Sequence, residues 1–371
     1  WMIKPFLDTV IIKLTSSCNI NCSYCYVFNG EDISFKELPN VMSLNTLNSV
    51  VKSLKIQSET QLEGFAIVLH GGEPLLLGYS KMEYFLTMLR KSLPEKIKYP
   101  ISIQTNGTLI NQQYIDLFLK TGTSVSVSLD GMQSVNDIAR LDHKNNTSFF
   151  KVLDGISLLN KHDDLLSGTL SVIHPNTSPK EIYNFFKSLN VTSSNFLLQD
   201  GNFNKLPIGK RNFESTEYGS WIKEMIEIYL SDNNPTFVIP FIDDLIRVGL
   251  GNKSYKEGIG NNRYSILIIE TDGEMRKNDT LRSSYNGADF LINRPNIQDT
   301  LIESVINSQD FLESSNLQTL VCDDCLKCEY LNICGGGMPL YRWSSEKKYN
   351  NPSIYCNDHK KYIEFLKEIL K

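Results

Sequence analysis

The chain has 371 residues, more than one average domain, which predicts one large domain with a smaller module attached. Hydrophobic residues make up 41%, an ordinary share for a globular protein, so a sizeable core is available. The net charge of -5 offers no basic face for nucleic acid, and no apolar run is long enough to span a bilayer. We therefore expect a cytoplasmic protein with no nucleic-acid partner and no membrane partner.

Six short apolar runs alternate with amphipathic stretches, which is typical of repeated strand–helix units and a parallel sheet. The strands are expected at residues 9–15, 64–70, 101–106, 124–130, 168–174 and 193–199. Helical patterns follow most of them, and Ser43 and Ser178 are the expected N-cap residues of two helices. Six such units predict an α/β fold, a partial (β/α)6 barrel with too few units for a full eightfold one.

The eight cysteines fall into two groups, three near the start of the chain and five near its end. No secretion signal opens the chain, so we expect thiols or metal ligands and no disulfides. Cys18, Cys22 and Cys25 follow the first predicted strand as C-x3-C-x2-C. Zinc would want a fourth ligand nearby, whereas a four-iron, four-sulfur cluster on three cysteines leaves one iron open to a small molecule.

Other motifs also follow predicted strands, where the loops of a parallel barrel carry the chemistry. The segment "GGEP", residues 71–74, comes after the second strand. Its glycines let the backbone approach a ligand, and Glu73 can accept a hydrogen bond from an ammonium group. The alternative is an ordinary strand-to-helix turn that stops at Pro74.

The second cysteine group supplies four thiolates, C-x2-C-x5-C followed by a distant cysteine. These residues are Cys325, Cys328, Cys334 and Cys356. Spacing alone favours zinc, because short C-x2-C pairs are common in zinc ribbons. Cys322 is left over, either as a spare thiol or as a competitor of Cys325 in a C-x2-C-x2-C run.

The first cysteine motif, with Tyr24 just before its third cysteine, resembles the defining motif of the radical SAM superfamily. The resemblance implies that Cys18, Cys22 and Cys25 hold a 4Fe-4S cluster that binds S-adenosyl-L-methionine (SAM) and releases a deoxyadenosyl radical from it. It also implies an external electron donor such as flavodoxin or ferredoxin.

By the same resemblance, Tyr24 and Glu73 belong to the cofactor site and Gly72 contacts the methionyl group of SAM. Ser128 in "SLDG" is implied to contact the ribose, and Arg140, ten residues after Asp130, the carboxylate. The alternatives for Ser128 and Arg140 are a sheet hydroxyl and a surface salt bridge.

The C-terminal region resembles the SPASM extension, which carries auxiliary iron–sulfur clusters in peptide-modifying enzymes. This resemblance reverses the preference for zinc. Asn278 and Met338 occupy two positions where the two-cluster version has cysteines. It therefore implies one auxiliary 4Fe-4S cluster. The expected domains are a radical SAM partial barrel at residues 1–235 and a SPASM-like domain at 236–371.

Segments such as "CYVFNGED", "IETDGEMRKNDTLR" and "CGGGMPLYRW" together look like the three-residue cyclophane-forming maturases, also described as Xye-, Grr-, Fxs- and His-Xaa-Ser-system enzymes. The resemblance implies a ribosomally made precursor peptide as partner and a cross-link from an aromatic ring carbon to a Cβ. Asp279 is the candidate proton acceptor, because it aligns with the catalytic aspartate of anaerobic sulfatase maturases. A turn carboxylate is the alternative role.

Three other functions compete with the cyclophane interpretation. One is a formylglycine-generating enzyme like the anaerobic sulfatase maturases, which convert Cys or Ser. Another is a thioether-forming maturase of the sactipeptide type. The third is a zinc scaffold that binds peptides without catalysis.

Overall fold

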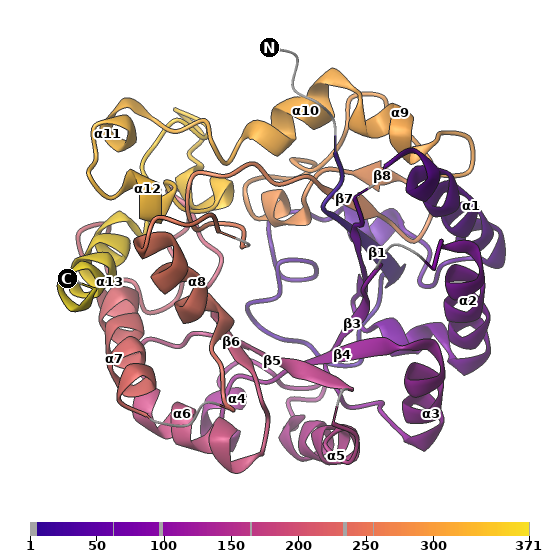
Figure 1. Cartoon of the computed structure of the whole chain (residues 1–371), viewed down its shortest axis with the longest axis horizontal. Coiled ribbons are helices and arrows are strands. Elements are labelled where there is room, and N and C mark those ends of the chain that lie inside the picture. Colours follow the sequence, from indigo (N-terminus) through magenta and orange to yellow (C-terminus); the bar gives the residue numbers. More distant parts are fainter. Residues whose placement is uncertain are drawn as a thin grey trace. The chain divides into compact units, whose positions relative to one another are not determined.

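The structure is a computed structural model, and it describes residues 6–61, 63–95, 99–163, 165–232, 236–254 and 256–370 (Figure 1). The chain divides into two compact units that alternate along the sequence. The first comprises Trp1–Ser128, Arg140–Ser167 and Ser265–Ser315, and the second Leu129–Ala139, Gly168–Tyr264 and Asn316–Lys371. The domain boundary expected at residues 235 and 236 stays a prediction, and residues 233–235 lie outside the described residues.

One mostly parallel sheet collects the strands of the described residues, in the order β6-β5-β4-β3-β2-β1-β7-β8. The strands are β1 Thr9–Thr15, β2 Ala66–Gly71, β3 Ile101–Thr105, β4 Thr123–Ser128, β5 Leu166–Val172, β6 Ser194–Leu197, β7 Ile266–Ile269 and β8 Met275–Arg276. Strand β1 runs parallel to both β2 and β7, with Val10 opposite Ile67 and Leu267. Strand β8 turns back antiparallel to β7.

The helices follow the strands as the alternating pattern predicts. The α-helices are α1 Leu44–Thr60, α2 Tyr79–Ser92, α3 Gln112–Thr121, α4 Gln133–Asn136, α5 Phe149–Leu159, α6 Pro179–Ser188, α7 Glu217–Ser231, α8 Pro240–Gly249, α9 Ile302–Ile306, α10 Gln309–Asn316, α11 Asp323–Leu326, α12 Leu331–Cys334 and α13 Cys356–Ile369. The short 3-10 turns are η1 Ser34–Glu37, η2 Pro74–Leu77, η3 Asp279–Ser283 and η4 Pro339–Arg342. No helix in the described ranges is long and apolar enough to cross a membrane.

The predicted α/β fold with six strand–helix units is confirmed. Each predicted strand matches one of β1 to β6 to within about two residues at either end. The two expected N-caps are present, since Ser43 accepts from the backbone N–H of Thr46 and Ser178 from that of Glu181. Strands β7 and β8 were not predicted.

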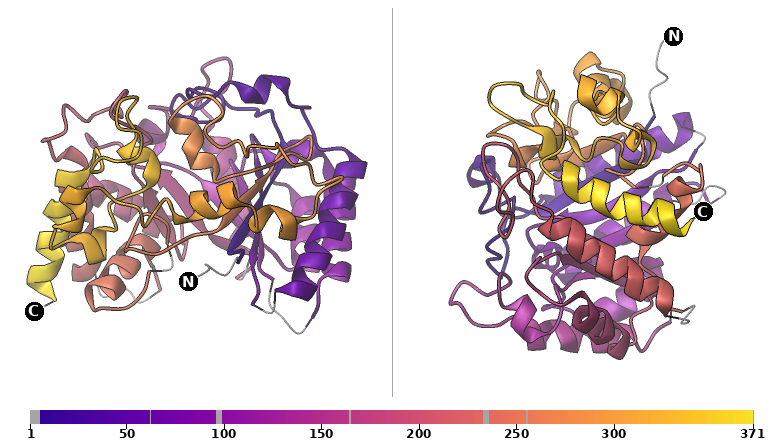
Figure 2. Two further views of the ribbon diagram at one scale, coloured as in Figure 1. Left: turned by 90° about the horizontal axis from the view of Figure 1, so that it is seen from above. Right: turned by 90° about the vertical axis from the view of Figure 1, so that its left-hand side faces the viewer.

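Each unit has its own packed core. In the first unit, helices α1, α2 and α3 lie along one side of β1 to β4 (Figure 1), and Val10, Ile12 and Leu14 of β1 are fully buried beneath them. In the second unit, α7 and α13 lie side by side (Figure 2). A buried ion pair at 2.7 Å joins Lys210 to Asp358 of α13, and Asp358 also accepts from the backbone N–H of Gly219 in α7.

The loop after β2 is tied to the loop after β3 by the carboxylate of Glu73, which is fully buried. One carboxylate oxygen accepts from the Thr105 hydroxyl at 2.7 Å and the Leu75 N–H at 3.0 Å, and the other accepts from the Asn106 N–H at 2.8 Å. At Gly72 an added Cβ would lie 2.1 Å from the carbonyl oxygen of Ser17, so this close approach requires glycine. Glu73 therefore fixes the loops after β2 and β3 relative to each other.

Replacing Glu73 with glutamine should destabilise the fold, because an amide NH2 would then face backbone N–H donors. We expect the free energy of unfolding to fall by about 1–3 kcal/mol, measured by urea denaturation. Glu83→Gln in α2, which breaks an exposed ion pair to Lys120, is the matched control with an expected loss below about 0.5 kcal/mol. Equal losses in the two variants would contradict this role of Glu73.

Candidate active site and cysteine pocket

The first cysteine loop leaves the end of β1 and is held by contacts within the first unit. Cys25 donates its N–H to the carbonyl of Cys22 at 3.0 Å, and the Asn29 side chain donates to the same carbonyl at 2.8 Å. The N–H of Asn21 bonds the carbonyl of Leu141 at 2.7 Å. The loop is thus folded back on itself and pinned to the segment after Arg140.

The sulfur atoms of this loop are in an environment that disfavours bare thiolates. Burial raises the pKa of Cys18 to about 12, with a smaller effect of the nearby Glu73 carboxylate. Burial also raises the pKa of Cys25, against hydrogen bonds from the backbone N–H groups of Phe28 and Val27. Cationic iron offsets this cost when thiols bind as thiolates, so the loop fits a cluster that carries its own positive charge.

The residues expected around SAM lie close to this loop in the same unit. Arg140 is buried and donates to the Tyr24 hydroxyl at 2.8 Å, and its charge acts on both Cys25 and Glu73. Ser128, at the end of β4, accepts from the Gln104 side chain at 2.8 Å. The structure therefore brings Tyr24, Arg140, Glu73 and the cysteines together. Direct SAM contacts of Gly72, Ser128 and Arg140 stay predictions.

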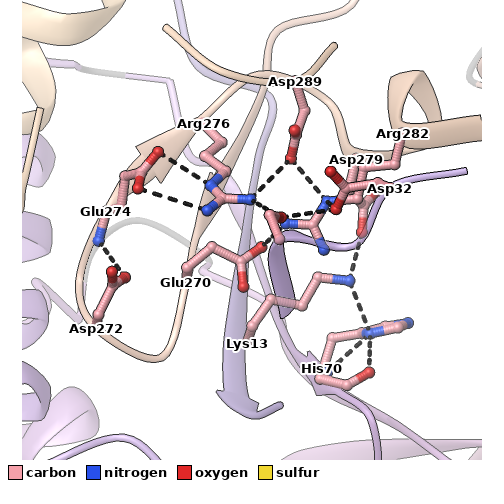
Figure 3. Close-up of polar contacts among 12 residues, drawn as sticks. Lys13, Asp32, His70, Glu270, Asp272, Glu274, Arg276, Asp279, Arg282 and Asp289 are labelled. Atoms are coloured by element: carbon pink, nitrogen blue, oxygen red, sulfur yellow. Dashed lines mark hydrogen bonds and ion pairs between the residues drawn. The ribbon is translucent and has the colours of Figure 1, made fainter. Parts of the chain in front are cut away.

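Asp279 lies at the start of η3 and is buried with Lys13 of β1 (Figure 3). Its carboxylate forms an ion pair with the Lys13 ammonium and accepts from the Tyr26 hydroxyl at 2.6 Å. Burial alone would raise the pKa of Asp279, but the Lys13 charge, with smaller contributions that include the hydrogen bonds from Lys13 and Tyr26, outweighs it and holds that pKa well below the usual range. Asp279 is therefore ionised at neutral pH.

His70, at the end of β2, completes this cluster. Its Nδ1 lies 3.2 Å from the Lys13 Nζ and accepts from the backbone N–H of Gly71 at 2.8 Å. Burial, followed by the Lys13 charge, lowers the pKa of His70 to about 3, so the ring is neutral. Because Nδ1 accepts, the ring proton is on Nε2.

A second row of buried charges holds η3 in place. Arg282 bonds Asp289 at 2.7 Å and Glu270 at 2.5 Å, and Arg276 bonds Glu274 at 3.1 Å (Figure 3). Burial would lower the pKa of Arg282, but the Glu270 and Asp289 carboxylates raise it further above its ordinary value. Since Arg282 and Asp279 share the same short turn, these pairs fix the backbone that carries Asp279.

Sequence reasoning missed three members of this cluster: Lys13, Tyr26 and His70. A signal for Lys13 was present, because a lysine inside the apolar run "TVIIKLT" needs a buried partner. Its partner, Asp279, lies in η3, the turn that follows the β7–β8 hairpin far along the chain. Nothing in the sequence alone placed that hairpin beside β1.

The second cysteine group lines a pocket of the second unit. The pocket has a volume of about 290 Å³, and Cys325, Cys328, Cys334 and Cys356 all line it. Burial raises the pKa values of Cys325 and Cys334 to about 12. Among the described residues, no three His, Cys, Asp or Glu side chains are placed so that they could hold a single metal ion. A pocket of this size walled by four thiols fits a cluster better than one zinc ion.

Cys322 lies beside this group, with its sulfur 3.6 Å from that of Cys325. It does not line the pocket, although it is buried. This geometry favours Cys325 as the ligand and Cys322 as a thiol in contact with it.

The fold and the first site define an α/β enzyme that uses radical chemistry. Residues 12–189 match the family model of the radical SAM superfamily, which covers β1 to α6 and all three cysteines of the first loop. This matched segment is a radical SAM domain, and such a domain implies a 4Fe-4S cluster and SAM as cofactors.

Curated relatives match almost the whole chain. A cysteine-type anaerobic sulfatase-maturating enzyme of Clostridium novyi (strain NT) is 26% identical over 370 residues, covering 96% of this chain and 94% of the relative. One from Clostridium perfringens (strain 13 / Type A) is 25% identical over 372 residues, covering 97% and 96%.

Two solved structures share the fold. One, native anSMEcpe with bound AdoMet and Cp18Cys peptide, is 23% identical with a TM-score of 0.84, and covers 98% of this chain and 97% of that one. Streptococcus suis SuiB bound to its precursor peptide SuiA is 14% identical with a TM-score of 0.63, covering 94% and 76%.

The prediction of a cyclophane-forming enzyme is wrong. Several relatives that match along almost the whole chain are anaerobic sulfatase-maturating enzymes, of both the cysteine type and the serine type. The segments behind that prediction surround the cysteines, Tyr26 and Asp279. They lie in the first cysteine loop, the turn that carries Asp279 and the second cysteine group, and none of them is a contact to the modified side chain that the structure shows.

Removing the Lys13 ammonium should leave Asp279 as an uncompensated buried charge. We expect Lys13→Met to lower the free energy of unfolding by about 3–5 kcal/mol at pH 7.5. Without the ammonium, burial raises the pKa of Asp279, so protonation removes the charge and the deficit should shrink as the pH falls to 5. Urea denaturation at both pH values measures this change.

The control for this prediction is the double variant Lys13→Met/Asp279→Asn. It contains no charge at either position, so it should be more stable at pH 7.5 than the single Lys13→Met variant. A deficit in Lys13→Met that is the same at both pH values would contradict the buried ion pair.

Proposed function

We propose that this chain is a radical SAM enzyme that oxidises a Cys or Ser side chain of a peptide substrate to formylglycine. The similarity of the whole chain to anaerobic sulfatase-maturating enzymes supports this activity. The Cp18Cys peptide bound to anSMEcpe supports a peptide substrate. The site itself supports the chemistry through Asp279.

Cys18, Cys22 and Cys25 would hold the cluster, and Tyr24, Gly72, Glu73, Ser128 and Arg140 would shape the SAM site. When bound, the cluster and SAM supply the removal of one hydrogen atom from the substrate Cβ, a bond too strong for any side-chain base. The chain would orient the substrate. It would also accept the proton and the electron that leave the substrate after the hydrogen atom.

Asp279 is the proposed proton acceptor for the thiol or hydroxyl of the substrate side chain. The observation that carries this role is its contact with Tyr26, the residue after Cys25, at 2.6 Å. This contact holds an ionised carboxylate next to the cofactor loop within the first unit. Loss of one hydrogen atom, one proton and one electron oxidises the side chain by two electrons. Serine then gives C=O directly, whereas cysteine gives C=S, which water hydrolyses to C=O with release of hydrogen sulfide.

The departing electron needs an acceptor. Cys325, Cys328, Cys334 and Cys356 would hold one auxiliary 4Fe-4S cluster for this purpose, and an external donor such as flavodoxin or ferredoxin would reduce the first cluster. The pocket that these four thiols line supports this assignment. Asn278 and Met338, at two positions where the two-cluster pattern has cysteines, support a single auxiliary cluster.

Anaerobically reconstituted protein should bind about eight irons per chain, because two 4Fe-4S clusters contain eight. The Cys18→Ala/Cys22→Ala/Cys25→Ala variant should retain about four irons and lose SAM cleavage. Iron and sulfide analysis measures the clusters, and analysis for zinc provides the control. Twelve irons, or zinc in the second site, would contradict a single auxiliary cluster.

Asp279→Asn keeps the shape of the side chain and removes the proton acceptor. The variant should still cleave SAM in the presence of peptide and carry deuterium from the substrate Cβ into deoxyadenosine. Formylglycine should fall by about 10²-fold or more, as for other general bases.

The matched control is Asp272→Asn in the β7–β8 turn, which leaves Lys13 and Tyr26 untouched and should make product at the parent rate. An Asp279→Asn enzyme that makes formylglycine at the parent rate would show that the base lies elsewhere.

A further inference from the structure

We infer that His359 donates a hydrogen bond from Nε2 to a sulfur of the iron–sulfur group held by Cys325, Cys328, Cys334 and Cys356. This inference rests on the auxiliary cluster of the proposed function. It assigns a role to a histidine outside the cysteine motif. The chemistry involved is a neutral N–H donor facing a thiolate or a sulfide.

His359 lies one helical turn after Cys356 in α13, so the two side chains share a face of the helix. Both line the same pocket. His359 is only 4% exposed, and its Nε2 has no hydrogen-bond partner among the described residues. A buried polar nitrogen without a partner is destabilising, so an acceptor supplied by a ligand in the pocket would account for it.

The other ring nitrogen of His359 is already used. Its Nδ1 lies 2.5 Å from the hydroxyl of Tyr362, which is also buried in α13. When the phenol donates to Nδ1, the ring proton is on Nε2. Tyr362 therefore orients the imidazole and leaves Nε2 as the nitrogen that can donate to a group in the pocket.

The glycines after Cys334 lie close to the His359 ring and to the Cys334 sulfur. At Gly337, which has φ +71, an added Cβ would lie 3.3 Å from His359 Nε2, so a glycine keeps the ring uncrowded. The backbone N–H of Gly336, which lines the pocket, is directed at the Cys334 sulfur, whereas the N–H of Gly337 donates to the Cys334 carbonyl at 3.2 Å. His359 would add a side-chain donor to the backbone donor of Gly336.

Four cysteines already supply the full ligand set of a 4Fe-4S cluster, so His359 acts as a donor and not as a ligand. Hydrogen bonds to cluster sulfurs stabilise the more negative, reduced state and raise the reduction potential. His359 would thus make the auxiliary cluster a better acceptor for the electron that leaves the substrate.

The test uses the full-length Cys18→Ala/Cys22→Ala/Cys25→Ala variant, reconstituted with iron and sulfide so that only the second site contains a cluster. The protein is labelled with 15N-histidine, reduced, and measured by pulsed electron paramagnetic resonance. We expect a weak nitrogen coupling that disappears when His359→Gln is introduced. No coupling, or a strong coupling typical of a directly bound imidazole, would overturn the inference.

A redox titration of the same protein gives a second, independent measurement. The potential should become more negative in His359→Phe, which has no donor, with four irons retained. Tyr362→Phe, which only frees the ring to turn, should produce a smaller shift of the same sign. Unchanged potentials in both variants would overturn the role of His359.

The metal content and the nitrogen coupling test the auxiliary cluster and the His359 hydrogen bond separately. Zinc in place of iron would overturn both the auxiliary cluster and this inference. Four irons without nitrogen coupling would overturn this inference alone and leave the proposed function intact.

Discussion

The buried ion pair between Lys13 and Asp279 is the interaction on which the candidate active site depends. It joins the first strand of the sheet to a turn 266 residues later, and Tyr26 extends it to the cysteine loop. A buried carboxylate is costly unless a cation compensates it, and the pairing of β7 with β1 brings the turn that carries Asp279 to Lys13. The same compensation keeps Asp279 ionised, which is the state that a proton acceptor needs.

Buried thiols are the second constraint, and they recur in both units. Burial raises the pKa of Cys18, Cys25, Cys325 and Cys334, so none of these groups is suited to remain a free thiolate. Each set becomes stable as thiolates only with a cationic partner. The first loop offers three cysteines beside Tyr24 and Arg140. The second site offers four cysteines around a pocket, and these unequal sets suit one cluster that binds a substrate molecule and one that is fully ligated.

Local patterns were sufficient to predict the six strands, two N-caps and the cysteine groups, because each depends on residues close in sequence. Lys13, Tyr26 and His70 were missed because their importance depends on Asp279, which reaches them only through the unpredicted β7–β8 hairpin. The apolar run "ILII" followed by "ETDG" was a usable hairpin signal. The substrate was misjudged because the informative motifs surround the cofactor, and cofactor residues do not identify the side chain that is oxidised.

The most direct test of the proposed activity is the product formed from a cysteine-containing peptide that matches a sulfatase maturation site. Reconstituted enzyme, SAM and a reductant should convert the cysteine to an aldehyde that reacts with a hydrazide probe, with loss of sulfur seen by mass spectrometry. The same assay with a serine peptide defines which side chain is preferred. A peptide that keeps its sulfur and acquires a thioether or a carbon–carbon cross-link, with no aldehyde, would contradict formylglycine formation.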